Sequence, residues 1–198
     1  MKPTNGSLKD RYNLGTDSPA DTFDDALLPT RGTRFDLGWQ LSRPDFGADG
    51  DFDTVEAVID KAWSWQRNTF RLGLDYRTTF RSDDLIQDFF PLGGFLRLSG
   101  LERGEISGPH SGLARVMFYR KVDETGGGLF DMPLYFGASV EAGNVWQARE
   151  DIALDDLIWN GSVFAGLDTY VGPLFLAAGF SEHGDTSFYL FLGAPQSR

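Results

Sequence analysis

The chain has 198 residues, a net charge of −11 at pH 7 and a pI of about 4.5, and it contains no cysteine. An acidic chain without a basic run lacks the clustered Lys and Arg that a phosphate backbone requires, so we expect no nucleic-acid partner. The lack of cysteine excludes a disulfide framework and a thiolate metal site. Abundant Gly (24 residues) and aromatic side chains (14 %) favour β-structure with many turns over a helical bundle.

Residues 1–31 are polar, acidic and rich in turn formers, and we interpret them as an arm and a turn that precede one domain over residues 32–198. No apolar run reaches the roughly 20 residues of a membrane helix. The start, MKPTNGSLKDRYNLG, lacks the apolar core of a signal peptide. That leaves two interpretations, a mature or excised segment and a chain that is not secreted.

Eight alternating segments follow in chain order. They read GTRFDLGWQLS, TVEAVIDKAWSW, TFRLGLDYRTTF, GLARVMFYRKV, LYFGASVEAGNVW, IWNGSVFAGLDTYV, LFLAAGFSE and SFYLFLGA. The second could be an amphipathic helix, but its β-branched residues and its alternating neighbours favour a strand. A long Gly-rich loop at about residues 82–111 separates the third segment from the fourth.

Each segment has one apolar and one polar face, because neighbouring side chains of a strand point in opposite directions. In the third segment Phe70, Leu72 and Leu74 share one face, and Arg71 and Asp75 share the other. A soluble sheet would turn its apolar face inward. A membrane barrel would turn it toward lipid and its polar face toward the lumen. For a barrel, the predicted lumen-facing residues are Arg34, Asp36, Glu56, Asp60, Arg71, Asp75, Arg77, Arg115, Glu141 and Asp168.

Three features favour the membrane barrel. The alternation continues through all eight segments, and the polar face carries small residues and charges of both signs, as suits a wet lumen. Aromatic residues of the apolar face lie near the segment ends, where outer-membrane barrels have aromatic girdles. They are Trp39, Trp63, Trp65, Tyr76, Phe80 and Trp159. We therefore predict an all-β fold, an antiparallel up-and-down transmembrane β-barrel of about eight strands in the bacterial outer membrane.

The order of motifs resembles the bacterial surface antigen barrels, which include outer-membrane assembly insertases and two-partner secretion transporters. The loop DFFPLGGFLRLSGLERGEISGP carries a Gly-Gly pair (Gly93 and Gly94) and, further on, the motif Leu98, Ser99 and Gly100. The strand SVEAGNVW and the terminal hairpin GPLFLAAGFSEHGDTSFYLFLG complete the pattern over about residues 29–193. In that family an Arg of the loop motif reaches into the lumen and pairs with an acidic strand residue.

Here Ser99 stands where the family has that Arg, and Glu141 falls on the acidic position. Because serine cannot form a salt bridge, we expect this loop lock to be altered or lost. Arg97 and Arg103 could substitute, but their spacing does not fit. The Leu-Ser-Gly form, with PTRG before the first strand and YLFLG at the end, looks more like the barrels fused behind bacterial patatin-like phospholipases.

The family barrel has about sixteen strands, so this chain matches its C-terminal half. Three alternatives stay open from the sequence. The eight strands close alone, they form half of a larger barrel, or two copies join edge to edge as a homodimer. In a barrel of eight strands the interior is just filled by side chains, and the charges would have to pair.

No serine has Gly at both −2 and +2, so the sequence lacks the nucleophile elbow of a patatin lipase. We expect no catalytic residue, no cofactor and no metal site in this chain. Phospholipase activity would belong to a fused N-terminal passenger domain. We expect His110 and His183 to be solvated loop residues, and the pair His110–Ser111 is a remote candidate for an outer-membrane hydrolase.

The sequence thus predicts an outer-membrane β-barrel that anchors or translocates a fused N-terminal domain. Its expected partners are outer-membrane lipid, the barrel assembly machinery during insertion and the passenger domain. The alternative from another class is a soluble β-barrel that binds a small apolar ligand in an apolar interior.

Overall fold

The computed structural model describes residues 20–25, 28–42, 52–81, 89–122, 133–169 and 172–192. The strands are β1 (Ala20–Asp21), β2 (Gly32–Ser42), β3 (Phe52–Trp65), β4 (Asn68–Arg81), β5 (Phe90–Leu92), β6 (Ile106–Gly108), β7 (His110–Val122), β8 (Leu134–Trp146), β9 (Ile158–Thr169), β10 (Gly172–Ser181) and β11 (Thr186–Leu192). One 3₁₀ turn, η3 (Arg149–Asp151), lies between β8 and β9. The predicted all-β fold is confirmed.

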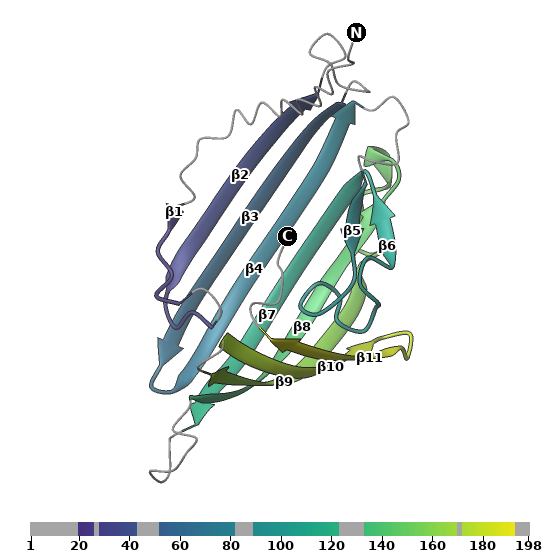
Figure 1. Ribbon diagram of the computed structural model, residues 1–198. Coiled ribbons are helices and arrows are strands. Elements are labelled where there is room, and N and C mark those ends of the chain that lie inside the picture. The colour runs from purple at the N-terminus through teal and green to yellow at the C-terminus, as the bar shows by residue number, and fades with distance from the viewer. Residues whose placement is uncertain are drawn as a thin grey trace, which may run out of the picture.

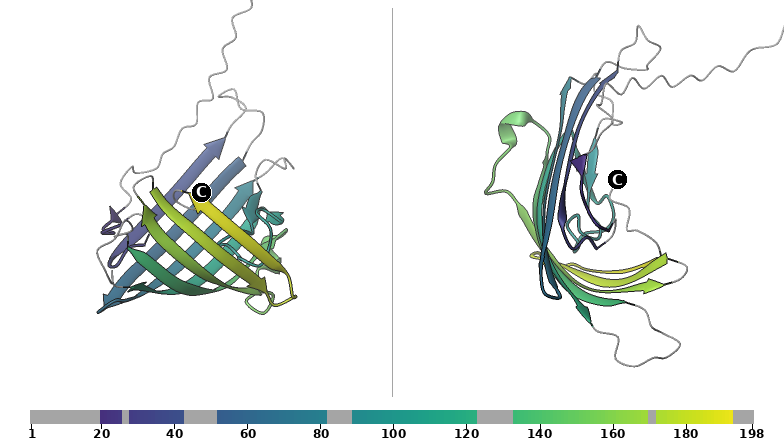
Figure 2. Two further views of the ribbon diagram at one scale, coloured as in Figure 1. Left: turned by 60° about the horizontal axis from the view of Figure 1, so that its bottom comes forward. Right: turned by 90° about the vertical axis from the view of Figure 1, so that its left-hand side faces the viewer.

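Nine strands form one sheet in the order β1-β2-β3-β4-β7-β8-β9-β10-β11, and every neighbouring pair is antiparallel (Figure 1). Eight of these strands have seven residues or more, and they follow the chain as the predicted up-and-down meander. The sheet is strongly curved, with β9 to β11 sweeping across the concave side of the other strands (Figure 2). Among the described residues the sheet stays open, because β2 and β11 do not pair.

The described part of the predicted long loop at about 82–111 contains two short strands. Within residues 89–109, β5 and β6 form a separate two-stranded sheet. His110 is already the first residue of β7, so the expectation of a solvated loop histidine is wrong for this residue. The segment 52–65, for which a helix was the alternative, is a strand. Within the described residues, no helix has the length and apolar character that crossing a bilayer requires.

Beyond β1, the described N-terminal residues Phe23, Leu28 and Pro29 lie on the concave side of the sheet. β1 pairs with Arg34 and Phe35 of β2. Further along, the Asp24 carboxylate accepts hydrogen bonds from the backbone N–H groups of Thr30 (2.7 Å) and Arg31 (3.1 Å), which forms a tight turn. The Tyr119 hydroxyl of β7 donates to the Pro29 carbonyl, so this segment is tied to the middle of the sheet.

The two faces of the sheet differ sharply in composition. The convex face carries a continuous set of exposed large apolar side chains, and the concave face buries charged and polar ones. On β4, Leu72 and Leu74 are 40 % and 46 % exposed, whereas Asp75 is 8 % exposed. A face of this kind is the opposite of a soluble sheet, in which the apolar side chains are the buried ones.

Aromatic side chains of the convex face lie toward the two ends of the strands. We define the turn end as the end with the Gln66–Arg67 turn between β3 and β4, and the loop end as the end from which residues 89–109 arise. The turn end carries Phe35, Trp63, Trp65, Phe70, Phe118 and Phe136. The loop end carries Trp39, Tyr76, Phe80, Trp159, Phe180 and Phe188. Aliphatic side chains lie between them, namely Leu37, Ile59, Leu72, Leu74, Val116, Val140, Val163, Leu176 and Leu190.

The separation of the aromatic bands matches an apolar layer. Phe70 and Phe80 are ten positions apart on β4. At about 3.4 Å per residue this is about 34 Å along the strand. A strand tilted by about 40° converts that length to about 26 Å of height, close to the apolar band of roughly 25 Å on outer-membrane barrels.

An aromatic cluster fills the concave side near the turn end. It consists of Leu28, Phe95, Met117, Tyr119, Phe164, Phe175 and Ala177. Two glycines make room for its rings. A Cβ on Gly137 would lie 2.3 Å from Cζ of Phe164, and a Cβ on Gly166 would lie 2.8 Å from Cε1 of Phe175. Gly137 and Gly166 therefore leave the space that the aromatic rings of Phe164 and Phe175 occupy.

We expect Gly137→Ala to lower the free energy of unfolding by about 1–3 kcal/mol, because the Phe164 ring would have to leave its low-energy position. Gly38→Ala is the matched control, since its Cβ would meet only the Glu56 Cβ, at 3.9 Å. Urea titration of the folded protein, followed by tryptophan fluorescence, measures both variants. Equal stability of the two variants would show that Phe164 does not depend on Gly137.

Candidate functional site

Residues 93–101 form a compact turn inside the concave side of the sheet. Gly93 and Gly94 have positive φ angles of 118° and 107°, which residues with a side chain rarely adopt. A Cβ on Gly93 would lie only 2.1 Å from the Glu102 carbonyl oxygen. The Gly93 N–H donates to the Arg97 carbonyl (2.8 Å), and the Gly94 N–H to the Leu101 carbonyl (3.2 Å). The Gly-Gly pair is thus required to reverse the loop tightly enough to fit.

Leu98 anchors the turn in an apolar cluster. It is fully buried with Leu92, Leu101 and Leu113, although its φ angle is +71°. A left-handed leucine is strained, typically by about 1–3 kcal/mol, and such strain persists only where the surroundings fix it. The burial of Leu98 offsets that cost and holds the next residue, Ser99, against the sheet.

Ser99 docks on Glu141 of β8, and we call this contact the loop latch. The Ser99 N–H donates to Oε2 of Glu141 (2.7 Å), and the Ser99 hydroxyl donates to Oε1 (2.6 Å). The Ser139 hydroxyl donates to the same Oε1 at 2.6 Å. Both Ser99 and Glu141 are 0 % exposed. A buried carboxylate that accepts three hydrogen bonds is compensated without an ion pair.

Of the two outcomes expected for the lock, altered or lost, the structure shows the altered one. Hydrogen bonds take the place of a salt bridge, and among the described residues Glu141 forms no ion pair. Ser99 can lie directly against the carboxylate because it is short. The loop motif and the acidic position are thus joined as the resemblance implies, with different chemistry.

Three further strands complete the latch. The Gly100 N–H donates to Oδ1 of Asn160 on β9 (2.8 Å), and the Tyr189 hydroxyl of β11 lies within hydrogen-bonding distance of the Ser99 (2.8 Å) and Leu101 (2.9 Å) carbonyls. A Cβ on Gly179 of β10 would lie 1.8 Å from the Ser99 carbonyl oxygen. The loop tip therefore touches all four of the last strands, β8 to β11.

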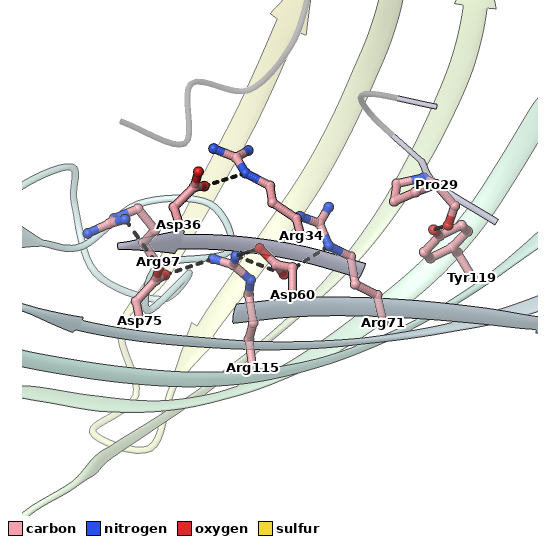
Figure 3. A network of polar contacts seen from close by, with 9 residues as sticks. All are labelled: Pro29, Arg34, Asp36, Asp60, Arg71, Asp75, Arg97, Arg115 and Tyr119. Atoms are coloured by element: carbon pink, nitrogen blue, oxygen red, sulfur yellow. Dashed lines mark hydrogen bonds and ion pairs between the residues drawn. The ribbon is translucent and has the colours of Figure 1, made fainter. Parts of the chain in front are cut away.

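A second polar set, the charge network, lies beside the latch on β3, β4 and β7 (Figure 3). Arg115 is at its centre, with Nη2 3.0 Å from Oδ2 of Asp60 and Nη1 3.2 Å from Oδ2 of Asp75. Nε of Arg71 lies 3.1 Å from Oδ1 of Asp60. Gly73 leaves the necessary space, because a Cβ there would lie 2.5 Å from Nε of Arg115. The two carboxylates are thus each held by a buried guanidinium.

Arg97 links the loop to this network. Its Nη1 lies 4.0 Å from Oδ2 of Asp75, so it does not serve Glu141, in agreement with the spacing argument. Burial, together with the positive charge of Arg77, lowers the pKa of Arg97 to about 10. Arg97 therefore stays cationic at neutral pH.

The remaining predicted lumen-facing residues lie toward the margin of the same face. Arg34 and Asp36 form an ion pair at 2.6 Å on β2, and Nε of Arg77 lies 3.7 Å from Oε2 of Glu56. Both pairs are more exposed than the central network. The side chain of Asp168 lies outside the described part of the structure.

His110 and Ser111 do not form a catalytic pair. Nδ1 of His110 lies 2.7 Å from the Thr78 hydroxyl, whereas Ser111 is buried on the opposite face of β7. Within the described ranges, no three His, Cys, Asp or Glu side chains gather in a group that could hold a metal ion.

Sequence reasoning missed Asn160, Ser139 and Tyr189 as members of the latch. Alternation places each of them on the polar face, together with Glu141. Which of them meet the loop depends on strand register, and the pairing Glu141↔Asn160 becomes visible only in the folded sheet.

No family model matches the chain, and no curated protein matches it. Among solved structures 11 chains match. One is BamA from Haemophilus ducreyi lacking POTRA domains 1–3, with a TM-score of 0.66 and 13 % sequence identity over 86 % of this chain. The chain spans 39 % of the length of that BamA chain. The chain therefore shares the β-sheet fold of part of that BamA structure.

We expect Ser99→Ala to weaken the latch by about 1–3 kcal/mol, because Glu141 loses a buried hydroxyl donor. Amide exchange at Ser99 and Gly100, measured by hydrogen–deuterium exchange, should rise by about 5- to 150-fold if these amides exchange through local opening. Glu102→Gln is the control, since this side chain is exposed. Unchanged protection in Ser99→Ala would mean that the loop is held without its hydroxyl.

We expect Arg115→Met to lower the free energy of unfolding by about 3–5 kcal/mol, because it leaves the buried Asp60 and Asp75 carboxylates undercompensated. Arg34→Met is the matched control, because Arg34 is 39 % exposed and its pair with Asp36 should be worth about 0–1 kcal/mol. Denaturant midpoints of the two variants measure the difference. Similar midpoints would contradict the central role of Arg115.

Proposed function

We propose that the chain is the β-barrel unit of an outer-membrane protein that anchors or translocates an N-terminal passenger domain. One observation carries this proposal, the exposed apolar convex face with aliphatic residues between two aromatic bands. In water such a face would promote aggregation, whereas in a bilayer it is the surface that partitions into hydrocarbon. The BamA-like fold supports the same conclusion.

The concave face supports a lumen. Its central charges, Asp60, Asp75 and Arg115, are paired, and the latch places residues 93–101 inside the curve of the sheet. A loop held there would narrow the lumen of a barrel, and its release would widen it. Translocation would then need the latch to open, whereas a pure anchor would keep it closed.

The passenger is the finer part of the proposal. The motif Leu98-Ser99-Gly100 and the terminal hairpin resemble the barrels behind bacterial patatin-like phospholipases, so we propose a patatin-like domain as the passenger. Lipase chemistry would then belong to that domain, and this chain would supply no catalytic group. Barrel assembly machinery would act on the chain during insertion.

The soluble alternative fits the structure poorly. A barrel that binds an apolar ligand needs the apolar face inside, but Leu72 and Leu74 lie outside and Asp60 and Arg115 lie inside. The aromatic cluster on the concave side is filled by the chain's own residues Phe95 and Leu28.

The test is insertion into lipid. The 198-residue chain is folded from urea into phosphatidylcholine vesicles and run on SDS gels with and without boiling. We expect a compact band that shifts on boiling. Leu74→Arg places a charge near the middle of the apolar band and should cost about 2–4 kcal/mol of folding in lipid.

Arg77→Leu is the matched control on the same strand. Its partner Glu56 is 47 % exposed, so the loss of this pair should leave insertion intact. Equal tolerance of Leu74→Arg and Arg77→Leu, or a chain that stays in solution without detergent, would overturn the membrane proposal.

A further inference from the structure

The sheet has two unpaired edges. Among the described residues β11 pairs only with β10, and β1 covers β2 only at Arg34 and Phe35. This leaves Thr186–Leu192 open along one edge, and residues 36–42 open along the other. In hydrocarbon every unpaired backbone group costs several kcal/mol, so both edges need partners if the proposed function holds.

Closure of one chain on itself conflicts with what the concave side contains. The interior of an eight-stranded barrel is just filled by the side chains of its own strands. Here the concave side also holds Phe23, Leu28 and Pro29 of the N-terminal segment, together with residues 89–109. Pro29, Leu92 and Leu98 of these segments are almost completely buried there. A barrel that encloses them must be wider than eight strands allow.

We propose that a second copy of this chain pairs with both edges and that the dimer is a sixteen-stranded barrel. β2 runs from the turn end to the loop end, and β11 runs back. A two-fold axis along the barrel therefore places β11 of one copy antiparallel to β2 of the other at both seams. This inference rests on the proposed function and names its partner.

The strand registers define the seam. One row of paired residues crosses all eight long strands, and its members share the convex face. It runs through Thr186, Phe180, Gly161, Val140, Val116, Leu72, Lys61 and Thr33. Thr33 is at the turn end of β2, and Thr186 is at the loop end of β11. The sheet is thus staggered, and a closed barrel must continue this stagger across the seam.

Alternation of faces restricts the seam to every second register. We place Leu190 opposite Trp39 and Leu192 opposite Leu37 in the seam, so that Thr186 of one copy faces position 43 of the other. The row of paired residues that begins at Thr33 of a copy therefore meets the next copy's β2 at position 43, a displacement along the strand of 43 − 33 = 10 residues per copy. Ten residues correspond to about 33 Å along the strands, and eight strands correspond to about 38 Å across the sheet. The strands would then be tilted from the barrel axis by about 41°, within the 35–45° of membrane barrels. A register shifted by two residues toward a larger displacement gives a strand tilt above that range. A register shifted by two residues in the other direction pairs Leu192 with Phe35, whose edge is already occupied by β1.

Disulfide cross-linking tests the seam, and the chain has no cysteine of its own. One chain carries Trp39→Cys and another carries Leu190→Cys. We expect the co-folded mixture in vesicles to give a covalent dimer on oxidation and each chain alone to give none. A chain with both substitutions should give a covalent dimer with two bridges.

Leu37→Cys with Phe188→Cys is the matched control. In the proposed register these positions are four residues out of step, about 13 Å, beyond the reach of a disulfide. A bridge within one chain would show closure of eight strands. No bridge at 39 and 190 in heat-modifiable protein would show that the edges do not meet in this way. Either result overturns the dimer and leaves the membrane proposal standing, whereas loss of heat-modifiability removes the membrane proposal itself.

Discussion

The whole structure depends on the pleat of the β-strand, which gives each residue of a strand to one face or the other. Eight long strands use one face for exposed apolar side chains and the other for charges and glycines. The distribution of side chains is therefore the reverse of that in a soluble protein, with charged and polar groups buried on the concave face and apolar groups exposed on the convex face. Such a sheet is stable only if something apolar covers the convex face and if the concave charges compensate one another.

The concave side meets the second condition in two ways. Around Arg115 the compensation is ionic, with Asp60 and Asp75 as partners. Around Glu141 it is made of hydroxyl and backbone donors, mainly those of Ser99. The second solution couples the charge to the position of the loop, since Glu141 keeps two of its three hydrogen-bond donors only while Ser99 is in place. Ser99 is completely buried with its hydroxyl 2.6 Å from the Glu141 carboxylate, so a longer side chain at position 99 would have to displace its neighbours.

The fold was largely predictable, because alternation and turn residues are local signals. The strands, their order and the faces of Leu74 and Arg115 all follow from period-two patterning. The latch was only half predictable. The pair Ser99 and Glu141 came from a resemblance, and its hydrogen bonds came from a backbone geometry that no local pattern encodes. His110 was misplaced because its Gly-rich neighbours suggested a loop, whereas pairing with Trp146 makes it a strand residue.

The two segments on the concave side determine how the edges are presented. Residues 89–109 are tied to β8 through β11, whereas residues 20–31 are tied to β2, β3 and β7. The loop also contacts the first half of the sheet, through Arg97 beside Asp75, through Leu98 beside Leu113 of β7, and through the Pro109 carbonyl, which accepts from the Thr79 N–H of β4. Both segments lie on the concave side, which is the interior of any barrel that this sheet forms. Closure of eight strands would leave little room for these segments, whereas the proposed partner of matching strand polarity would let both edges pair without expelling them.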